Sequence, residues 1–144
     1  MINNERVIVA SPLAPKAVGP YSQAVKFGNF IFCSGSIPLH PETGEVVGSD
    51  VATQTEQVLK NLEAVLQVVD SGLFQVVKTT VYLTSLDDFA EMNAVYAKFF
   101  PVDPPARATV EVSRLPKEVL VEIDCIAVMP QRIVGGGPTI GPNL

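Results

Sequence analysis

The apolar residues of this chain repeat at two different spacings, and the spacing predicts the secondary structure. Short runs rich in branched and aromatic residues, bounded by glycine, proline and polar residues, are typical of strands. In two longer segments the apolar residues recur every three or four positions, as they do on one side of a helix. The predicted helices span 50–70 and 86–100, and the predicted strands span 5–9, 23–27, 29–34, 75–83, 107–113 and 119–128.

Local signals support several of these boundaries. The pair Gly28-Asn29 between two short strands predicts a tight hairpin turn. Ser49 or Asp50 can cap the start of the first helix, and Gly72 stands where a left-handed residue would end it. The glycines and prolines within 35–50 predict a long loop.

The order β-β-β-α-β-α-β-β predicts an α+β fold, in which a mixed sheet carries both helices on one face. The last two strands are expected to form a hairpin that turns around 115–117. Residues 1–128 then make a single domain, and 129–144 form a flexible extension with little to bury. The second face of the sheet lacks a cover, which indicates self-association.

Composition agrees with an oligomer. Only 17% of the 144 residues are charged, against about 25% in an average soluble domain, so part of the surface is expected to be buried between subunits. The net charge is −5 and no basic run occurs, which argues against nucleic-acid and membrane partners. No apolar run is long enough for a membrane span, and 1–9 lacks the apolar core of a secretory signal, so we expect a cytoplasmic protein, with import into an organelle left open.

Cysteine and histidine offer little chemistry here. Cys33 and Cys125 are far apart, and each lies inside an apolar run, so we interpret both as buried structural thiols. The one histidine, His40, lies in a proline-flanked loop and is expected to be solvated. We therefore predict no metal site.

The last two strands hold the charged residues of most interest. Alternation places Arg107 and Thr109 on one face of their strand, and Glu122 and Asp124 on one face of the next. If Thr109 pairs with Glu122 in a hairpin, Arg107 faces Asp124. A solvated cross-strand salt bridge is one interpretation. The other is a site for an anionic substrate, because arginine grips a carboxylate at two points and a nearby glutamate can hold water or move a proton.

Two further residues allow both a structural and a functional interpretation. Asn93 lies on the apolar side of the second helix, where its amide makes either a structural hydrogen bond or a contact in a site. Tyr21 follows the rigid pair Gly19-Pro20 at the edge of a strand, and it either packs or takes part in catalysis.

Several motifs resemble those of the RidA family (YjgF/YER057c/UK114), the reactive-intermediate imine deaminases. They run in unbroken order through about 12–128, and the block around Arg107 is the most specific. The matching motifs are VGPYSQAV at 18–25, CSGSIPLHPETGEVV at 33–47, QTEQVLKNLEAVL at 54–66, VVKTTVYLTSLDDFAEMNAVYAKFF at 76–100 and PPARATVEVSRLPKEVLVEIDCIAV at 104–128.

The resemblance implies a chorismate-mutase-like fold, a homotrimer and sites in the clefts between subunits. It implies that Arg107 clamps the substrate carboxylate and that Glu122 orients or activates the attacking water. Tyr21, Ser34 and Asn93 match positions that line the same cleft, and Gly35 matches a close approach of the main chain to the ligand.

At two positions the chain departs from the best-known active members of that family. Thr109 stands where many have cysteine, and Ser36 where many have glutamine. The Thr109 hydroxyl can still form a hydrogen bond with the substrate, so we expect activity without thiol chemistry.

The implied activity is hydrolysis of 2-imino acids and their enamines, such as 2-aminoacrylate and 2-iminobutanoate, to 2-oxo acids and ammonia. Positioning and one proton transfer are sufficient for this reaction, so we expect no metal or organic cofactor. The alternatives are a non-catalytic, ligand-binding or chaperone-like trimer and, ranked behind it, an endoribonuclease, which the acidic charge opposes.

Overall fold

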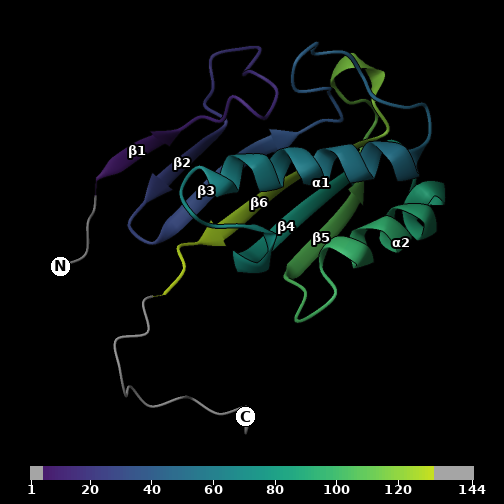
Figure 1. The fold of residues 1–144 in the computed structure, drawn as a ribbon. Helices are drawn as coiled ribbons and strands as arrows, with labels where there is room; N and C mark the ends of the chain where they lie inside the picture. The colour runs from purple at the N-terminus through teal and green to yellow at the C-terminus, as the bar shows by residue number, and fades with distance from the viewer. Residues whose placement is uncertain (1–4, 132–144) are drawn as a thin grey trace, which may run out of the picture.

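A computed structural model describes residues 5–131 as one sheet with two helices on the same side of it (Figure 1). Most of the predicted extension, residues 132–144, lies outside the described part. The predicted elements all form, with ends that shift by a few residues. Their bounds are β1 Arg6–Val9, β2 Ala24–Phe27, β3 Phe30–Ser36, α1 Val51–Gln67, β4 Val76–Leu83, α2 Phe89–Phe99, β5 Ala106–Glu111 and β6 Val121–Val128.

The strands are ordered β1-β2-β3-β6-β4-β5, and this order contradicts the predicted hairpin of the last two strands. β4 lies between β5 and β6, pairing in parallel with β5 and antiparallel with β6. Parallel neighbours need a crossover connection, which α2 provides between β4 and β5. The chain then returns through 112–120 to place β6 in the middle of the sheet.

Turns and caps form largely where the sequence indicates them. Gly28 has a φ of 60°, and the two-residue turn it opens joins β2 to β3. The Asp50 carboxylate caps α1, since it accepts the Thr53 N–H at 3.0 Å. The left-handed residue after α1 is Asp70, at φ 59°, whereas Gly72 is extended, so the predicted role of Gly72 was wrong.

The core lies between the helices and the sheet. Alternate residues of the central strands, such as Ile31, Val81 and Ile123, pack there against Leu59 and Leu62 of α1. Cys33 and Cys125 are both buried and free, as predicted, and they stand opposite each other in the pairing of β3 with β6. His40 is an exposed loop residue whose Nδ1 accepts the N–H groups of Glu42 and Thr43.

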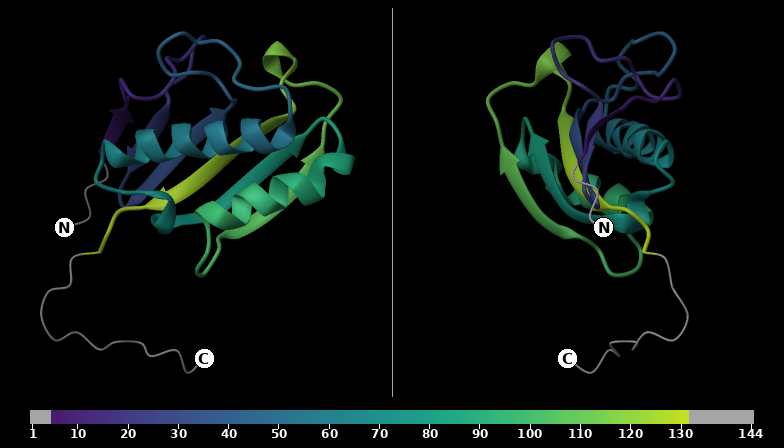
Figure 2. Two further views of the ribbon diagram at one scale, coloured as in Figure 1. Left: turned by 45° about the vertical axis from the view of Figure 1, so that its right-hand side comes forward. Right: turned by 90° about the vertical axis from the view of Figure 1, so that its left-hand side faces the viewer.

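No element of residues 5–131 covers the other face of the sheet, because both helices lie on one side (Figures 1 and 2). Phe27, Phe30 and Phe32 of the β2–β3 hairpin remain 47%, 49% and 46% exposed. The prediction of an uncovered face is therefore confirmed for the single chain. Within the same part of the chain, no helix is long and apolar enough to cross a membrane.

Candidate active site

Arg107 lies on the side of the sheet that carries the helices. The pairing of β4 with β5 sets it beside Thr79, whose side chain is buried under α2. Its guanidinium carbon stands 4.7 Å from the ring centroid of Tyr96 and 5.6 Å from that of Phe89. Two aromatic faces near a guanidinium attract it electrostatically and fix its orientation.

The predicted salt bridge between Arg107 and Asp124 does not exist. β4 separates the two strands, and the two side chains lie on opposite faces of the sheet. Asp124 instead accepts a hydrogen bond from the Tyr82 hydroxyl at 3.0 Å. Neither ion pair found in residues 5–131 involves Arg107, so the N–H groups of its guanidinium remain available to bind an anion.

α2 supplies the rings beside Arg107. Phe89, Asn93 and Tyr96 follow one another at steps of four and three, so they lie along one side of the helix. The Tyr96 hydroxyl is 2.8 Å from the Thr79 hydroxyl, and this hydrogen bond ties the ring to β4. The sequence analysis assigned Phe89 and Tyr96 only to the apolar side of the helix. Their helical spacing to Asn93 was the signal that could have placed both rings in the candidate site.

Asn93 and Thr109 both bring polar groups without partners to this side. The Asn93 side chain is half-buried and makes no hydrogen bond within residues 5–131, so the structural interpretation of its amide is not supported. The Thr109 Oγ1 is buried without a partner, two positions after Arg107 on the same face of β5. Buried polar atoms are normally paired, so the unpaired Thr109 hydroxyl, next to an arginine that makes no ion pair within residues 5–131, indicates a place for a polar ligand.

Glu122 lies on the open face of β6, together with Gly35 of β3. The pairing of β3 with β6 shifts at a bulge between Cys33 and Ser36. At this bulge the Glu122 side chain occupies the space that a Cβ on Gly35 would need. A Cβ added to Gly35 would stand 2.9 Å from the carboxyl carbon of Glu122. Only glycine permits this approach without displacing the carboxylate.

Burial raises the pKa of the Glu122 carboxyl, and the nearby charge of Asp124 raises it further. Burial also raises the pKa of Tyr82, with the hydrogen bond to Asp124 as the next cause, so this phenol stays protonated and keeps donating. A carboxyl group with a raised pKa takes up and returns a proton more readily near neutral pH than an ordinary glutamate does.

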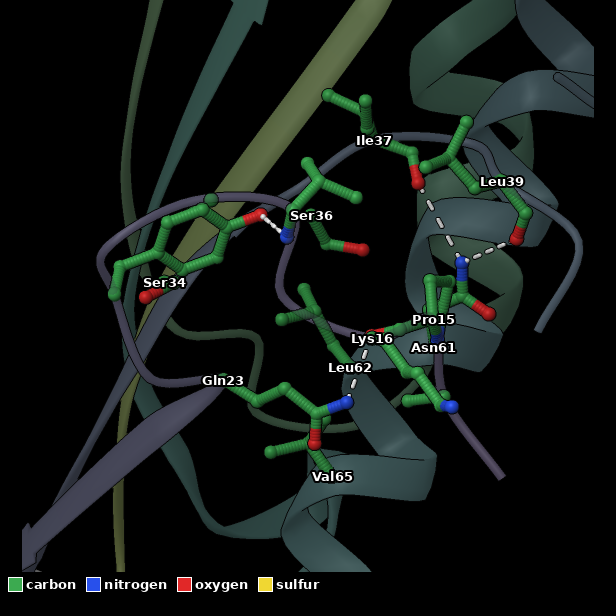
Figure 3. A pocket seen from close by; sticks show the side chains of 14 residues that line it. Pro15, Lys16, Gln23, Ser34, Ser36, Ile37, Leu39, Asn61, Leu62 and Val65 are labelled. Carbon is green, nitrogen blue, oxygen red and sulfur yellow. Dashed lines mark hydrogen bonds between the residues drawn. The ribbon is translucent and has the colours of Figure 1, made fainter. Parts of the chain in front are cut away.

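Ser34 and Tyr21 lie next to the bulge. The Ser34 hydroxyl donates to the Ser22 carbonyl at 2.6 Å, and the Tyr21 hydroxyl accepts the Val18 N–H at 3.2 Å. Tyr21 is 49% exposed, so tight packing does not describe it. Together with Gly35, these two residues line a pocket that α1 closes (Figure 3).

The predicted site residues therefore form two groups. Arg107, Asn93 and Thr109 lie on the helix side of the sheet, and Glu122 lies on the open side with Gly35 beside it. A single chain does not bring Arg107 to Glu122.

Comparison with known proteins settles the relationship. The family model described as Endoribonuclease L-PSP matches residues 11–129, nearly the whole described chain. The chain belongs to this family. Its members include the Rid proteins, as the names of relatives and solved structures show, which confirms the resemblance drawn from the motifs.

Curated relatives of this L-PSP/Rid chain carry several names. It is 53% identical over 120 residues to a RutC family protein of Pyrococcus abyssi, covering 83% of this chain and 94% of the relative. It is 46% identical over 125 residues to the chloroplastic Reactive Intermediate Deaminase A of Arabidopsis thaliana, covering 87% of this chain and 67% of the relative.

Solved structures of Rid relatives share its fold. The E. coli YjgF gene product superimposes with a TM-score of 0.81 at 47% identity, covering 85% of this chain and 98% of that one. E. coli TdcF with bound serine gives a TM-score of 0.82 at 41% identity, covering 86% of this chain and 99% of that one. The predicted α+β class, with two helices on one face of a mixed sheet, is confirmed.

Proposed function

We propose that this protein hydrolyses 2-imino acids, such as 2-iminopropanoate and 2-iminobutanoate, to 2-oxo acids and ammonia. The observation that carries the proposal is the guanidinium of Arg107, held beside two rings and free of any carboxylate in residues 5–131. A planar fork of this kind suits a ligand with its own carboxylate. The deaminase name of the Arabidopsis relative supports the same chemistry.

The proposed mechanism divides the work between the two groups of residues. Arg107 binds the substrate carboxylate and so fixes the imine carbon, while the orphaned Thr109 hydroxyl gains a partner in the bound ligand. Glu122 takes a proton from the water that attacks the imine carbon. It then returns the proton to the nitrogen, and the carbinolamine breaks down to the 2-oxo acid and ammonia. Tyr21, Ser34, Gly35 and Asn93 line the site.

The two groups can meet only across a subunit boundary, because they lie on opposite faces of the sheet. Glu122 would then face Arg107 of the partner subunit. The exposed apolar side chains of the open face offer the surface for this association. We therefore propose a homotrimer with its sites between subunits. We also propose that the protein works in the cytoplasm.

We expect light scattering at micromolar protein to give the mass of a trimer, about three times that of the 15.4 kDa chain. The half-exposed phenylalanines Phe27, Phe30 and Phe32 form apolar surface on the open face, which favours association over a monomer in solution. Replacing Phe32 with glutamate would put a charge on that face and is expected to lower the mass, whereas the same change at Phe74, an exposed residue outside the sheet, should not. A monomer in the parent protein would refute the shared site.

Replacing Thr109 with valine tests the orphaned hydroxyl. Valine keeps the shape, and no hydrogen bond is lost within residues 5–131, so thermal stability should stay equal or rise slightly. Turnover should fall by about ten-fold, the cost of one hydrogen bond to a charged ligand at about 1.5 kcal/mol. Lost stability with unchanged turnover would make Thr109 a structural residue.

The direct test couples the purified protein to a dehydratase that releases 2-aminoacrylate, and follows the decay of the imine. We expect faster decay than in buffer alone, with ammonia and a 2-oxo acid as products. Because the family description and two similar solved structures carry the name endoribonuclease, an RNA-cleavage assay belongs beside it. The net charge of −5 argues against RNA as the substrate. Binding of 2-oxo acids without turnover of any imine would favour a non-catalytic, ligand-binding trimer.

A further inference from the structure

Thr79 is a fully buried threonine that the proposed mechanism does not use. It lies on β4, directly beside Arg107 in the parallel pairing of β4 with β5. Its hydroxyl is 2.8 Å from the hydroxyl of Tyr96 in α2. The next buried positions of β4, Val81 and Leu83, are apolar. Because a buried hydroxyl stabilises a core only through its hydrogen bond, the role of Thr79 lies in what that bond holds.

The ring of Tyr96 is restrained on several sides. α2 carries one end of the side chain, and the bond to Thr79 ties the hydroxyl end to β4. The ring of Phe100 packs against it, with centroids 4.6 Å apart and planes at 38°. The Tyr96 ring that lies 4.7 Å from the Arg107 guanidinium therefore has a fixed place relative to β4 and β5.

Tyr96 differs in this respect from the other ring beside Arg107. Phe89 is 40% exposed and has no hydroxyl, so no side-chain hydrogen bond can hold it. Burial raises the pKa of Tyr96, so its phenol stays protonated at neutral pH and leaves the charge of Arg107 for an anion. Of the two rings, Tyr96 is thus the one whose position another side chain fixes, and that side chain is Thr79.

We propose that Thr79 is a positioning residue, whose hydrogen bond holds the Tyr96 ring where this ring orients the Arg107 guanidinium for two-point binding of a carboxylate. The inference rests on the proposed function, which assigns the substrate carboxylate to Arg107. Two-point binding requires the planes of the guanidinium and the carboxylate to match. A fixed aromatic face favours one orientation of the guanidinium. Without it the imine carbon swings, which lowers the rate more than the affinity, since the charge of Arg107 remains.

Thr79→Val and Tyr96→Phe each remove one hydroxyl and keep the shape of the side chain. Either change should lower kcat for imine hydrolysis by about ten-fold, because a poorly placed substrate reacts more slowly. The Kd for 2-oxobutanoate should change less. Each single variant leaves the other hydroxyl buried without this partner, so its melting temperature should fall by a few degrees. Thr79→Ser keeps a hydroxyl and should restore kcat.

The matched control is Thr55→Val. Thr55 is also fully buried, but its hydroxyl donates to a carbonyl of its own helix, that of Val51, at 2.7 Å. The control loses a buried hydrogen bond of the same kind without touching Tyr96 or Arg107. It should change the melting temperature and leave kcat close to that of the parent.

The double variant, Thr79→Val with Tyr96→Phe, separates positioning from stability. It leaves neither hydroxyl unpaired, so its melting temperature should return close to that of the parent. Its kcat should stay at the level of the more affected single variant, because both changes break the same bond. Recovery of kcat together with the melting temperature would make the bond purely structural. A loss of kcat equal to the product of the two single losses would mean independent effects, and it would also overturn the proposal.

A measurement without turnover distinguishes this inference from the proposed function. The chain has four arginines, so NMR relaxation of their Nε–H groups can follow Arg107, assigned from the spectrum of Arg107→Lys. The order parameter of the Arg107 Nε–H should fall in Thr79→Val and stay at the parental value in Thr79→Ser. Tyr96→Phe gives the same readout should Thr79→Val fail to fold.

The two proposals can fail separately. If no imine is hydrolysed but the order parameters follow this pattern, the proposed function fails and the positioning role of Thr79 holds. If imines are hydrolysed, and both kcat and the order parameter stay unchanged in Thr79→Val and Tyr96→Phe, the positioning role fails and the proposed function stands.

Discussion

Arg107→Lys is expected to lose nearly all imine hydrolysis, about a hundred-fold or more, while the protein stays folded and keeps its oligomeric state. Lysine preserves the positive charge but replaces a planar fork with a single ammonium, which holds a carboxylate at one point and lets the imine carbon swing. The structure adds a second reason. The two aromatic rings hold a flat guanidinium, and a shorter-reaching ammonium would lie differently against them.

The matched control is Arg114→Lys, an arginine outside the proposed site whose ion pair with Glu118 is exposed to solvent. It should leave turnover and melting temperature close to those of the parent. Activity of Arg107→Lys within a few-fold of the parent would remove Arg107 from the site. Because the salt bridge with Asp124 is already excluded, Arg107 would then have only its packing against α2 as a role.

Glu122→Gln is expected to separate ligand binding from turnover. Glutamine has nearly the same shape as glutamate and can still hold a water, but it cannot take up a proton. Hydrolysis should therefore fall by one order of magnitude or more, since acid–base catalysis typically contributes about 10²–10⁴-fold. Binding of 2-oxobutanoate should stay close to that of the parent, because Arg107 provides most of the affinity. Calorimetry and the imine assay measure the two quantities on one preparation.

The pH profile gives Glu122→Gln a second readout. A base must be ionised, so turnover should fall as pH drops through the pKa of Glu122, which burial and Asp124 hold above the ordinary glutamate value. That acid limb should disappear in Glu122→Gln. Asp124→Asn removes the neighbouring charge, so it should move the limb to lower pH. Unchanged turnover with lost binding or a broken trimer would make Glu122 structural, and Tyr21 would become the next candidate for the proton transfer.

The sequence by itself determined the elements and the face that each residue occupies along its own strand or helix. Those properties are local. A period of two or of three to four positions follows from backbone geometry, and a cap such as Asp50 needs only its next three residues. The alternation that set Arg107 with Thr109, and Glu122 with Asp124, was therefore correct within each strand.

The tertiary structure alone decided which strands are neighbours. The sequence predicted a hairpin because β5 and β6 are consecutive, but the pairing of β6 with both β3 and β4 uses contacts between distant segments that no local pattern encodes. That one difference moved Arg107 and Glu122 from a shared face to opposite faces. It also replaced a plausible surface salt bridge with two separate groups of residues, which the proposed function joins across a subunit boundary. Whether the faces that carry Arg107 and Glu122 are on the same side depends on the order and pairing of all the strands, so only the tertiary structure could decide it.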